Sequence, residues 1–96
     1  MSLLKSPSAP GRVLKNLYLD PLSLSAISLA KQLGVPRSRI ERLLKGSTSM
    51  TPDSAVRLAY FFATTPQYWM NLQVNYDMAK TEVDVSAITP LCQNAA

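Results

Sequence analysis

The sequence predicts a small all-α protein of five helices joined by short connections. Apolar residues recur three or four positions apart in successive segments, which is the spacing of a helix with one buried face. Proline, glycine or a hydroxyl residue stands at most ends of these segments, and no internal segment alternates as a strand would. The length of 96 residues and the hydrophobic fraction of 47% fit one globular domain.

The first helix is predicted to start at Pro10, after a lead-in over residues 1–9 that we expect to be flexible. Proline suits the first turn because its fixed φ and missing N–H cost nothing there. Three apolar residues follow at helical spacing, namely Val13, Leu14 and Leu17. Asp20-Pro21 ends the helix, since the residue before a proline avoids the α conformation.

Two short helices are predicted on either side of Gly34. Ser25 is a favoured N-cap for the first of them, and Gly34 tolerates the positive φ at its end. Pro36 suits the start of the second, which runs from Arg37 to Lys45 and stops at Gly46. The residues predicted to face inward are Ala26, Leu29, Ala30 and Leu33 on the first helix and Ile40, Leu43 and Leu44 on the second.

Two further helices begin at similar signals. Thr51-Pro52-Asp53 offers a hydroxyl cap, a proline in the first turn and an acid at the positive end of the helix. Thr65-Pro66 repeats this start, and the helix that follows extends to Lys80, which makes it the longest. The helical domain therefore spans residues 10–80. Residues 81–96 are predicted to be a short extended segment or a disordered tail, and they are a candidate interface segment.

Positive charge is concentrated in one of these helices. The whole chain carries +4, but residues 37–45 alone hold four basic residues against one acidic residue. Residues 76–96 reverse the balance, with one basic residue against three acidic ones. A short and strongly basic helix is what a nucleic-acid-binding surface requires.

Several classes of function are disfavoured by what the chain lacks. It has no histidine, which rules out catalytic triads and the HExxH zinc motif, and it has no Gly-rich phosphate loop. We therefore expect no enzyme, no cofactor and no metal. Cys92 is the only cysteine, so no internal disulfide can form and a cytoplasmic setting is expected. No apolar run approaches the roughly 20 residues of a membrane span, and the N-terminus is unlike a signal peptide.

The two helices around Gly34 predict a helix-turn-helix that reads double-stranded operator DNA. A short turn holds the helices at a steep angle, so the second can enter a major groove with its N-terminal residues deepest. Arg37 or Arg42 can grip guanine O6 and N7 with both guanidinium arms, and Ser38 can reach a base or a phosphate. Ser25 and the free N–H groups beside it are candidates for a phosphate clamp. Contacts to the DNA backbone are predicted for Arg39, Lys45, Ser47, Thr48 and Ser49.

Two sequence patterns resemble a known family. The central helices resemble the Cro/repressor-like (XRE) helix-turn-helix family through Ser25-x3-Leu29-Ala30-x2-Leu33-Gly34-Val35-x4-Ile40-x2-Leu43-x2-Gly46. Three further segments resemble the HigA-type antitoxins of that family, namely Pro10-Gly11-x2-Leu14, Thr51-Pro52-Asp53-x-Ala55-x-Arg57-Leu58-Ala59 and Pro66-x2-Trp69-x-Asn71-Leu72-Gln73-x2-Tyr76-Asp77. The resemblance covers residues 10–80 and implies a five-helix Cro/repressor-like DNA-binding domain.

The resemblance also implies a function. HigA-type antitoxins bind and neutralise a small toxin protein, typically a ribosome-dependent mRNA endonuclease, and as homodimers they repress their own operon. The family's base-reading positions fall on Arg37, Ser38 and Arg42. Pro36 departs from the family pattern, in which Ser or Thr often caps this helix, so a capping hydroxyl and a candidate phosphate contact are lost. Ala9 stands where many relatives have His.

The last helix carries the predicted dimer contacts. Its stripe of Trp69, Leu72 and Tyr76 is interpreted as core or dimer interface, and Gln73 as a surface residue or a polar member of that interface. The first helix with its lead-in is the rival surface. Three consecutive aromatic residues, 60–62, cannot all face inward, so at least one should meet a partner or cover a neighbouring helix.

Two alternatives stand beside a dimeric antitoxin. One is a stand-alone repressor with the same fold and no toxin partner. The other is a protein-interaction module whose basic helix binds an acidic partner, because a run of charge is often only a solvated helix face.

Overall fold

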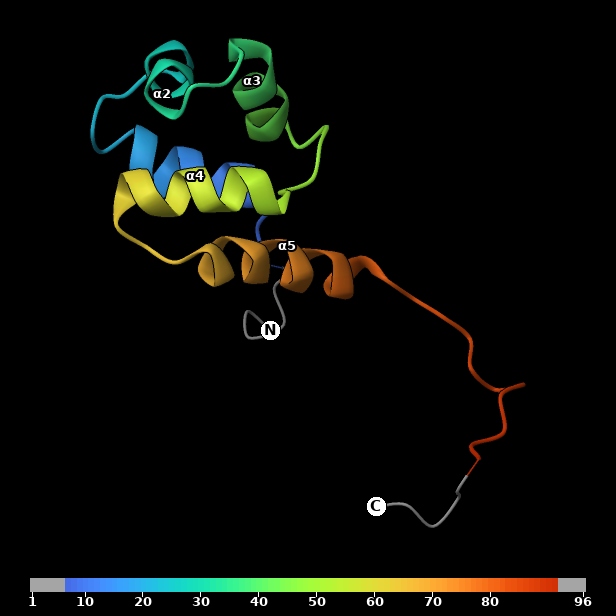
Figure 1. The fold of residues 1–96 in the computed structure, drawn as a ribbon. Coiled ribbons are helices and arrows are strands. Elements are labelled where there is room, and N and C mark those ends of the chain that lie inside the picture. Colours follow the sequence, from blue (N-terminus) through green and yellow to red (C-terminus); the bar gives the residue numbers. More distant parts are fainter. Residues whose placement is uncertain (1–6, 92–96) are drawn as a thin grey trace.

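The computed structural model describes residues 7–91, and within this range it contains helices and no strand. The elements are α1 (Pro10–Val13), η2 (Leu14–Leu19), α2 (Ala26–Leu33), α3 (Arg37–Lys45), α4 (Pro52–Phe62) and α5 (Pro66–Lys80). Since α1 and η2 are continuous, the described residues form five helices. The predicted all-α fold is confirmed (Figure 1). The predictions made for residues 1–6 and for Cys92 lie outside the described residues.

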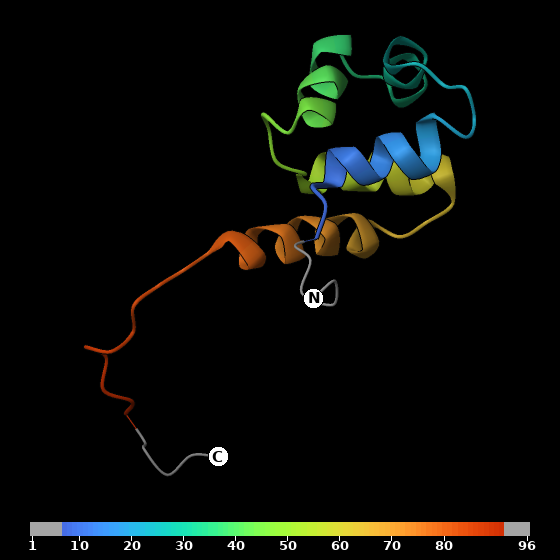
Figure 2. The same cartoon turned by 180° about the vertical axis from the view of Figure 1, so that it is seen from behind.

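The helices are arranged in layers that Figure 1 shows clearly. The α2–α3 pair lies at one end, α4 crosses the middle, and α5 lies on the far side of α4. The first helix runs behind α4 in this view and in front of it in Figure 2, which is turned by 180°. It contacts both α3 and α5, so it joins the α2–α3 pair to the last helix.

Local signals in the sequence account for the starts and ends of the helices. Side-chain oxygens of Ser25, Thr51 and Thr65 each accept a hydrogen bond from the backbone N–H three residues later, at 3.1, 3.3 and 3.1 Å. Each cap satisfies one N–H group that the first helical turn leaves free. Gly34 and Gly46 end α2 and α3 with φ of 72° and 79°, a conformation that favours glycine.

The first helix departs from regular α geometry in its second half. η2 has a wider π-helical turn, in which the Asp20 N–H donates to the Lys15 carbonyl five residues back at 2.9 Å. This turn brings Leu14 and Leu19 onto one face, and both are buried. Leu17, which regular helical spacing grouped with Leu14, is instead 63% exposed.

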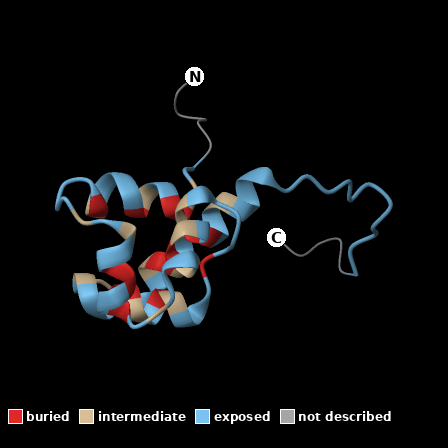
Figure 3. Cartoon of the chain, turned by 90° about the horizontal axis from the view of Figure 1, so that it is seen from above, coloured by how far each residue is buried: buried red, intermediate tan, exposed pale blue. Residues whose placement is uncertain are grey.

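Trp69 lies in a core to which every helix contributes. Its indole is fully buried, and the Nε1–H donates to Thr64 Oγ1 at 2.7 Å. In Figure 3 the buried positions lie between the helices, whereas the outer faces are exposed. The interpretation of Trp69 as a packing residue is confirmed.

The consecutive aromatic residues of α4 divide between interior and surface, as their spacing predicted. Phe62 packs against the core and against Tyr18, with ring centroids 4.8 Å apart. Phe61 lies at the edge and meets Phe62 edge-on at 4.9 Å, while Tyr60 points outward and is almost fully exposed.

Tyr18 connects the first helix to α5 through a hydrogen bond between two tyrosines. Its hydroxyl donates to Tyr68 Oη at 3.2 Å, and this hydrogen bond, followed by burial, raises the pKa of Tyr18 from its ordinary 10.0 to about 12. Ionised Tyr18 is therefore disfavoured in the folded protein. The stabilisation is complete below the unfolded-state pKa and is lost as pH rises through the folded-state value.

We expect the denaturant concentration at the unfolding midpoint of the wild type to decrease as the pH is raised from 10.0 to about 12. In Tyr18→Phe this decrease should be smaller. Chemical denaturation at a series of pH values measures it. The two proteins differ only at Tyr18, so the comparison isolates its contribution. An equally steep fall in Tyr18→Phe would show that another group is responsible.

Residues 81–91 continue from α5 as an extended segment with a turn at residues 86–87. All of them are exposed, and the segment leads away from the helices in both Figure 1 and Figure 2. The apolar side chains that it exposes are Val83, Val85, Ile88 and Leu91. No helix in residues 7–91 combines the length and the apolar character needed to cross a membrane.

Candidate DNA-binding surface

The turn between α2 and α3 is short and held by backbone hydrogen bonds. The N–H groups of Gly34 and Val35 donate to the carbonyls of Lys31 and Ala30 at 3.3 and 3.0 Å, which completes the end of α2. Pro36 is the extended N-cap of α3 and offers no side-chain hydrogen bond. The helix predicted to read DNA, α3, is called the recognition helix below. It begins without a capping hydroxyl, as expected from Pro36 at this position.

One face of α3 is anchored and the opposite face is free. Ile40 and Leu43 are buried in the core, as their spacing predicted, and Leu44 is half-buried. The exposed positions of this helix are Arg37, Ser38, Arg42 and Lys45, all of them predicted to contact DNA. Because the buried face holds the helix in place, these four side chains are presented from one rigid element.

The exposed cations of α3 are largely uncommitted. Arg37 Nε lies 3.4 Å from Glu41 Oε2, and both side chains of this pair are exposed. Such surface pairs contribute little energy, so the arrival of DNA can displace this one. Within residues 7–91, Arg42 and Lys45 form no ion pair. All three cations are therefore available to phosphates or base edges.

Arg39 is placed differently from the other basic residues of α3. Its side chain is only 32% exposed and reaches α4, where Nη2 donates to Asp53 and, at 3.0 Å, to Ser54 Oγ. In the protein without DNA this guanidinium is therefore occupied by α4, unlike Arg42 and Lys45. The DNA backbone contact of Arg39 stays a prediction, since helical position alone could not show that this side chain meets Asp53.

The regions predicted to contact phosphates flank α3. Ser25 is exposed at the start of α2, where its Oγ accepts the Ser28 N–H and its hydroxyl donates to Ser28 Oγ at 3.1 Å. The loop after α3 exposes three hydroxyl residues, namely Ser47, Thr48 and Ser49. The structure therefore places polar groups at the surface on both sides of the recognition helix.

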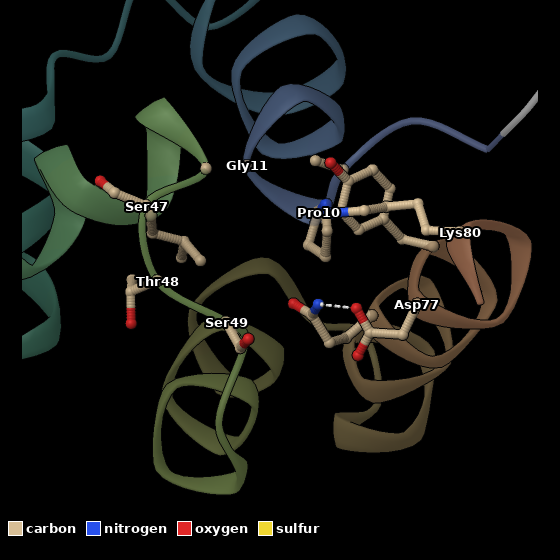
Figure 4. Close-up of a pocket in the computed structure, with 12 residues that line it drawn as sticks. Pro10, Gly11, Ser47, Thr48, Ser49, Asp77 and Lys80 are labelled. Atoms are coloured by element: carbon tan, nitrogen blue, oxygen red, sulfur yellow. Dashed lines mark hydrogen bonds between the residues drawn. The ribbon is translucent and has the colours of Figure 1, made fainter. Parts of the chain in front are cut away.

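Gln73 supports this loop from α5, a role that the sequence did not predict. Its Oε1 accepts the buried Met50 N–H at 2.7 Å, and its Nε2 donates to Asp77 Oδ1 at 2.9 Å. This amide lines a polar cleft of about 140 Å³ between residues 46–49, the start of α1 and α5. Figure 4 shows the side chains that line it. The buried amide thus holds the end of the loop at Met50, directly before α4.

Two of the four residues predicted for the dimer interface are buried within the chain. Trp69 belongs to the core and Gln73 is 8% exposed, so the dimer prediction is wrong for both. Leu72 and Tyr76 are half-buried, and Tyr76 carries the Lys80 ammonium 4.6 Å from its ring centroid. The physical reason is that the aromatic stripe of α5 packs against α4 and the first helix, which leaves only the opposite face free.

Arg57 is a further residue that sequence reasoning missed. Its Nη1 donates to the Leu33 carbonyl at 2.6 Å, which joins α4 to the end of α2. The spacing of four residues from Asp53 could have indicated an ion pair on one helix, but no local pattern points to Leu33. Among the described residues, no group of three His, Cys, Asp or Glu side chains is placed to hold a metal ion.

The arrangement of α2, the turn and α3 agrees with the result of comparing the sequence with models of protein families. The helix-turn-helix family model matches residues 14–69, which is more than half of the chain. The chain belongs to the helix-turn-helix family. The exposed basic helix α3 is therefore the second helix of a helix-turn-helix fold.

Individual relatives show which members of the family this chain is similar to. This helix-turn-helix protein is similar to virulence-associated protein I of Dichelobacter nodosus, with 39% identity over 90% of this chain and 82% of the relative. It is similar to the structure of a HigA-family addiction module antidote protein from Coxiella burnetii, at 43% identity, a TM-score of 0.74 and 78% and 82% coverage of the two chains. It is also similar to Pseudomonas aeruginosa antitoxin HigA solved with the higBA promoter, at 33% identity, a TM-score of 0.74 and 76% and 79% coverage. The resemblance to Cro/repressor-like proteins and HigA-type antitoxins is confirmed.

Proposed function

We propose that this helix-turn-helix protein is a dimeric cytoplasmic antitoxin that represses its own operon and neutralises a toxin protein. The observation that carries the proposal is the free face of α3, where Arg37, Ser38 and Arg42 are exposed while the other face is anchored in the core. An antitoxin with the same fold was solved with promoter DNA, which supports the same use of this face.

Binding to DNA from upstream of its own reading frame tests the repressor function. A dimer should protect an inverted repeat whose half-sites lie about one helical turn, or a multiple of it, apart. We expect this operator to bind at least roughly 10³-fold more tightly than a scrambled duplex, with an affinity that falls steeply as salt rises. Equal weak binding to both duplexes would overturn base-specific recognition and favour the protein-interaction module.

The free face of α5 and the tail that follows it support the dimer. Val74 and Met78 lie one turn apart on this face and are 50% and 67% exposed. The tail continues directly from the helix and exposes Val83 and Val85 as well. A group of apolar side chains of this kind is typical of an interface.

Replacing Val74 and Met78 together by lysine should give a monomer in analytical ultracentrifugation, because dimerisation would bury unpaired charges. Operator affinity should then fall at least about tenfold, since a single protomer binds one half-site only. Leu17→Lys is the control, because Leu17 is an exposed apolar residue on the rival surface of the first helix. A monomeric Leu17→Lys protein beside a dimeric α5 variant would place the interface on the first helix.

The toxin partner is tested by co-expression with the product of the adjacent reading frame. A toxin should arrest growth when expressed alone, and this protein should restore growth and co-purify with it. If the two proteins remain separate and growth is not restored, the function reduces to that of a stand-alone repressor.

A further inference from the structure

Asp53, in the first turn of α4, is the meeting point of two arginines from different elements. Arg39 of α3 donates to Asp53 Oδ2 through Nη2, and the same nitrogen donates to Ser54 Oγ at 3.0 Å. Arg57 of α4 donates to the same Asp53 oxygen through Nε at 2.9 Å. One carboxylate therefore holds the recognition helix against α4.

The second arginine extends this connection to α2. Arg57 Nη1 donates to the Leu33 carbonyl at 2.6 Å. Leu33 is the last residue of α2, where carbonyls lack helical partners and the helix end is negative, so a guanidinium is a favourable partner. Asp53, Arg39 and Arg57 thus form a continuous chain of contacts from α3, through α4, to the turn between α2 and α3.

In this chain of contacts two arginines share one carboxylate. Arg39 and then Arg57 hold the pKa of Asp53 below its ordinary value, so the carboxylate is ionised at neutral pH. An exposed ion pair by itself contributes little to stability. Asp53, Arg39 and Arg57 together connect α2, α3 and α4, so their contacts can fix how these helices lie relative to one another.

We propose that Asp53 is a positioning residue for DNA recognition, which acts through Arg39 and Arg57 to set α3 relative to the end of α2. The inference rests on the proposed operator binding. Phosphate contacts at Ser25 and base contacts at Arg37 and Arg42 must meet one duplex at the same time. A small rotation of α3 against α2 would break that match while leaving non-specific attraction to phosphates intact.

Two substitutions with opposite changes of charge test the proposal. Asp53→Asn removes a negative charge with little change in shape, and Arg57→Ala removes a positive charge and the contact with Leu33. We expect both to lower the ratio of operator affinity to scrambled-duplex affinity, by roughly tenfold. Affinity for the scrambled duplex should stay equal or rise in Asp53→Asn and should fall in Arg57→Ala.

The ratio separates positioning from stability and from net charge. Partial unfolding lowers the affinities for operator and scrambled duplex by the same factor, so it leaves their ratio unchanged. A pure charge effect raises both affinities in Asp53→Asn and lowers both in Arg57→Ala. Asp20→Asn is the matched control, because it breaks the exposed Lys15–Asp20 pair of 3.0 Å with the same change of charge. Its ratio should equal that of the wild type.

Binding is measured by fluorescence anisotropy well below the thermal midpoint of each variant. Wild-type ratios in Asp53→Asn and Arg57→Ala, together with operator preference in the wild type, would overturn the positioning role alone. A wild type without operator preference would overturn the proposed function and this inference with it.

Discussion

Replacing Gly11 by alanine is expected to lower the free energy of unfolding by at least roughly 3 kcal/mol. A Cβ at this position would lie 1.9 Å from the Leu43 carbonyl oxygen and 2.8 Å from its carbon. These are backbone atoms of α3, so no side-chain rotation can relieve the clash. The first helix and the recognition helix would have to separate, and the packing around Leu14 and Leu43 would loosen.

Urea unfolding followed by circular dichroism measures this effect, and Gly46→Ala is the matched control. Gly46 has a φ of +79° but no atom within 4 Å of the added Cβ. Alanine there should cost only the left-handed strain, about 1 kcal/mol. If Gly11→Ala costs no more than Gly46→Ala, the close approach of the first helix to α3 is not as tight as the structure has it.

Removing Arg37 and Arg42 together is expected to lower operator affinity by roughly 10² to 10⁴, because each side chain that grips a base contributes about 1–3 kcal/mol of discrimination. Each single alanine variant should lose at least about tenfold. Neither side chain contributes to the core, since both are exposed, so thermal stability should change little. Anisotropy titrations with operator and scrambled duplexes measure the effect.

Lys15→Ala is the control for the single variants, since it removes one positive charge from the first helix. Its operator affinity should change only slightly and by the same factor on both duplexes. If the arginine variants also lose affinity equally on both duplexes, Arg37 and Arg42 contact phosphates and the bases are recognised elsewhere.

Most of the fold follows from rules that act within a single helix. The caps at Ser25, Thr51 and Thr65 and the helix ends at Gly34 and Gly46 were predicted because each depends on a few neighbouring residues. The exposed face of α3 was predicted for the same reason, since helical spacing alone separates Ile40 and Leu43 from the basic side. The wider turn of η2 was not predicted, because regular spacing placed Leu17 with the buried residues.

The candidate site was predicted less completely, because several side chains there choose partners on other elements. Arg39 looks like Arg42 in the sequence, yet it binds Asp53, fourteen residues away. Gln73 looks like a surface amide, yet it accepts the N–H of Met50, twenty-three residues away. Both partners lie much farther along the sequence than the three or four residues that separate neighbours on one helix.

The helix-turn-helix formed by α2, the turn at Gly34 and α3, with its basic face, was thus determined by the sequence itself, through spacing, caps and charge. Only the tertiary structure decided which cations of α3 form no ion pair, which face of α5 stays exposed, and how Asp53, Arg57 and Gly11 support α3. The physical reason is that spacing and capping energies are local, whereas these contacts form only after distant segments have packed together.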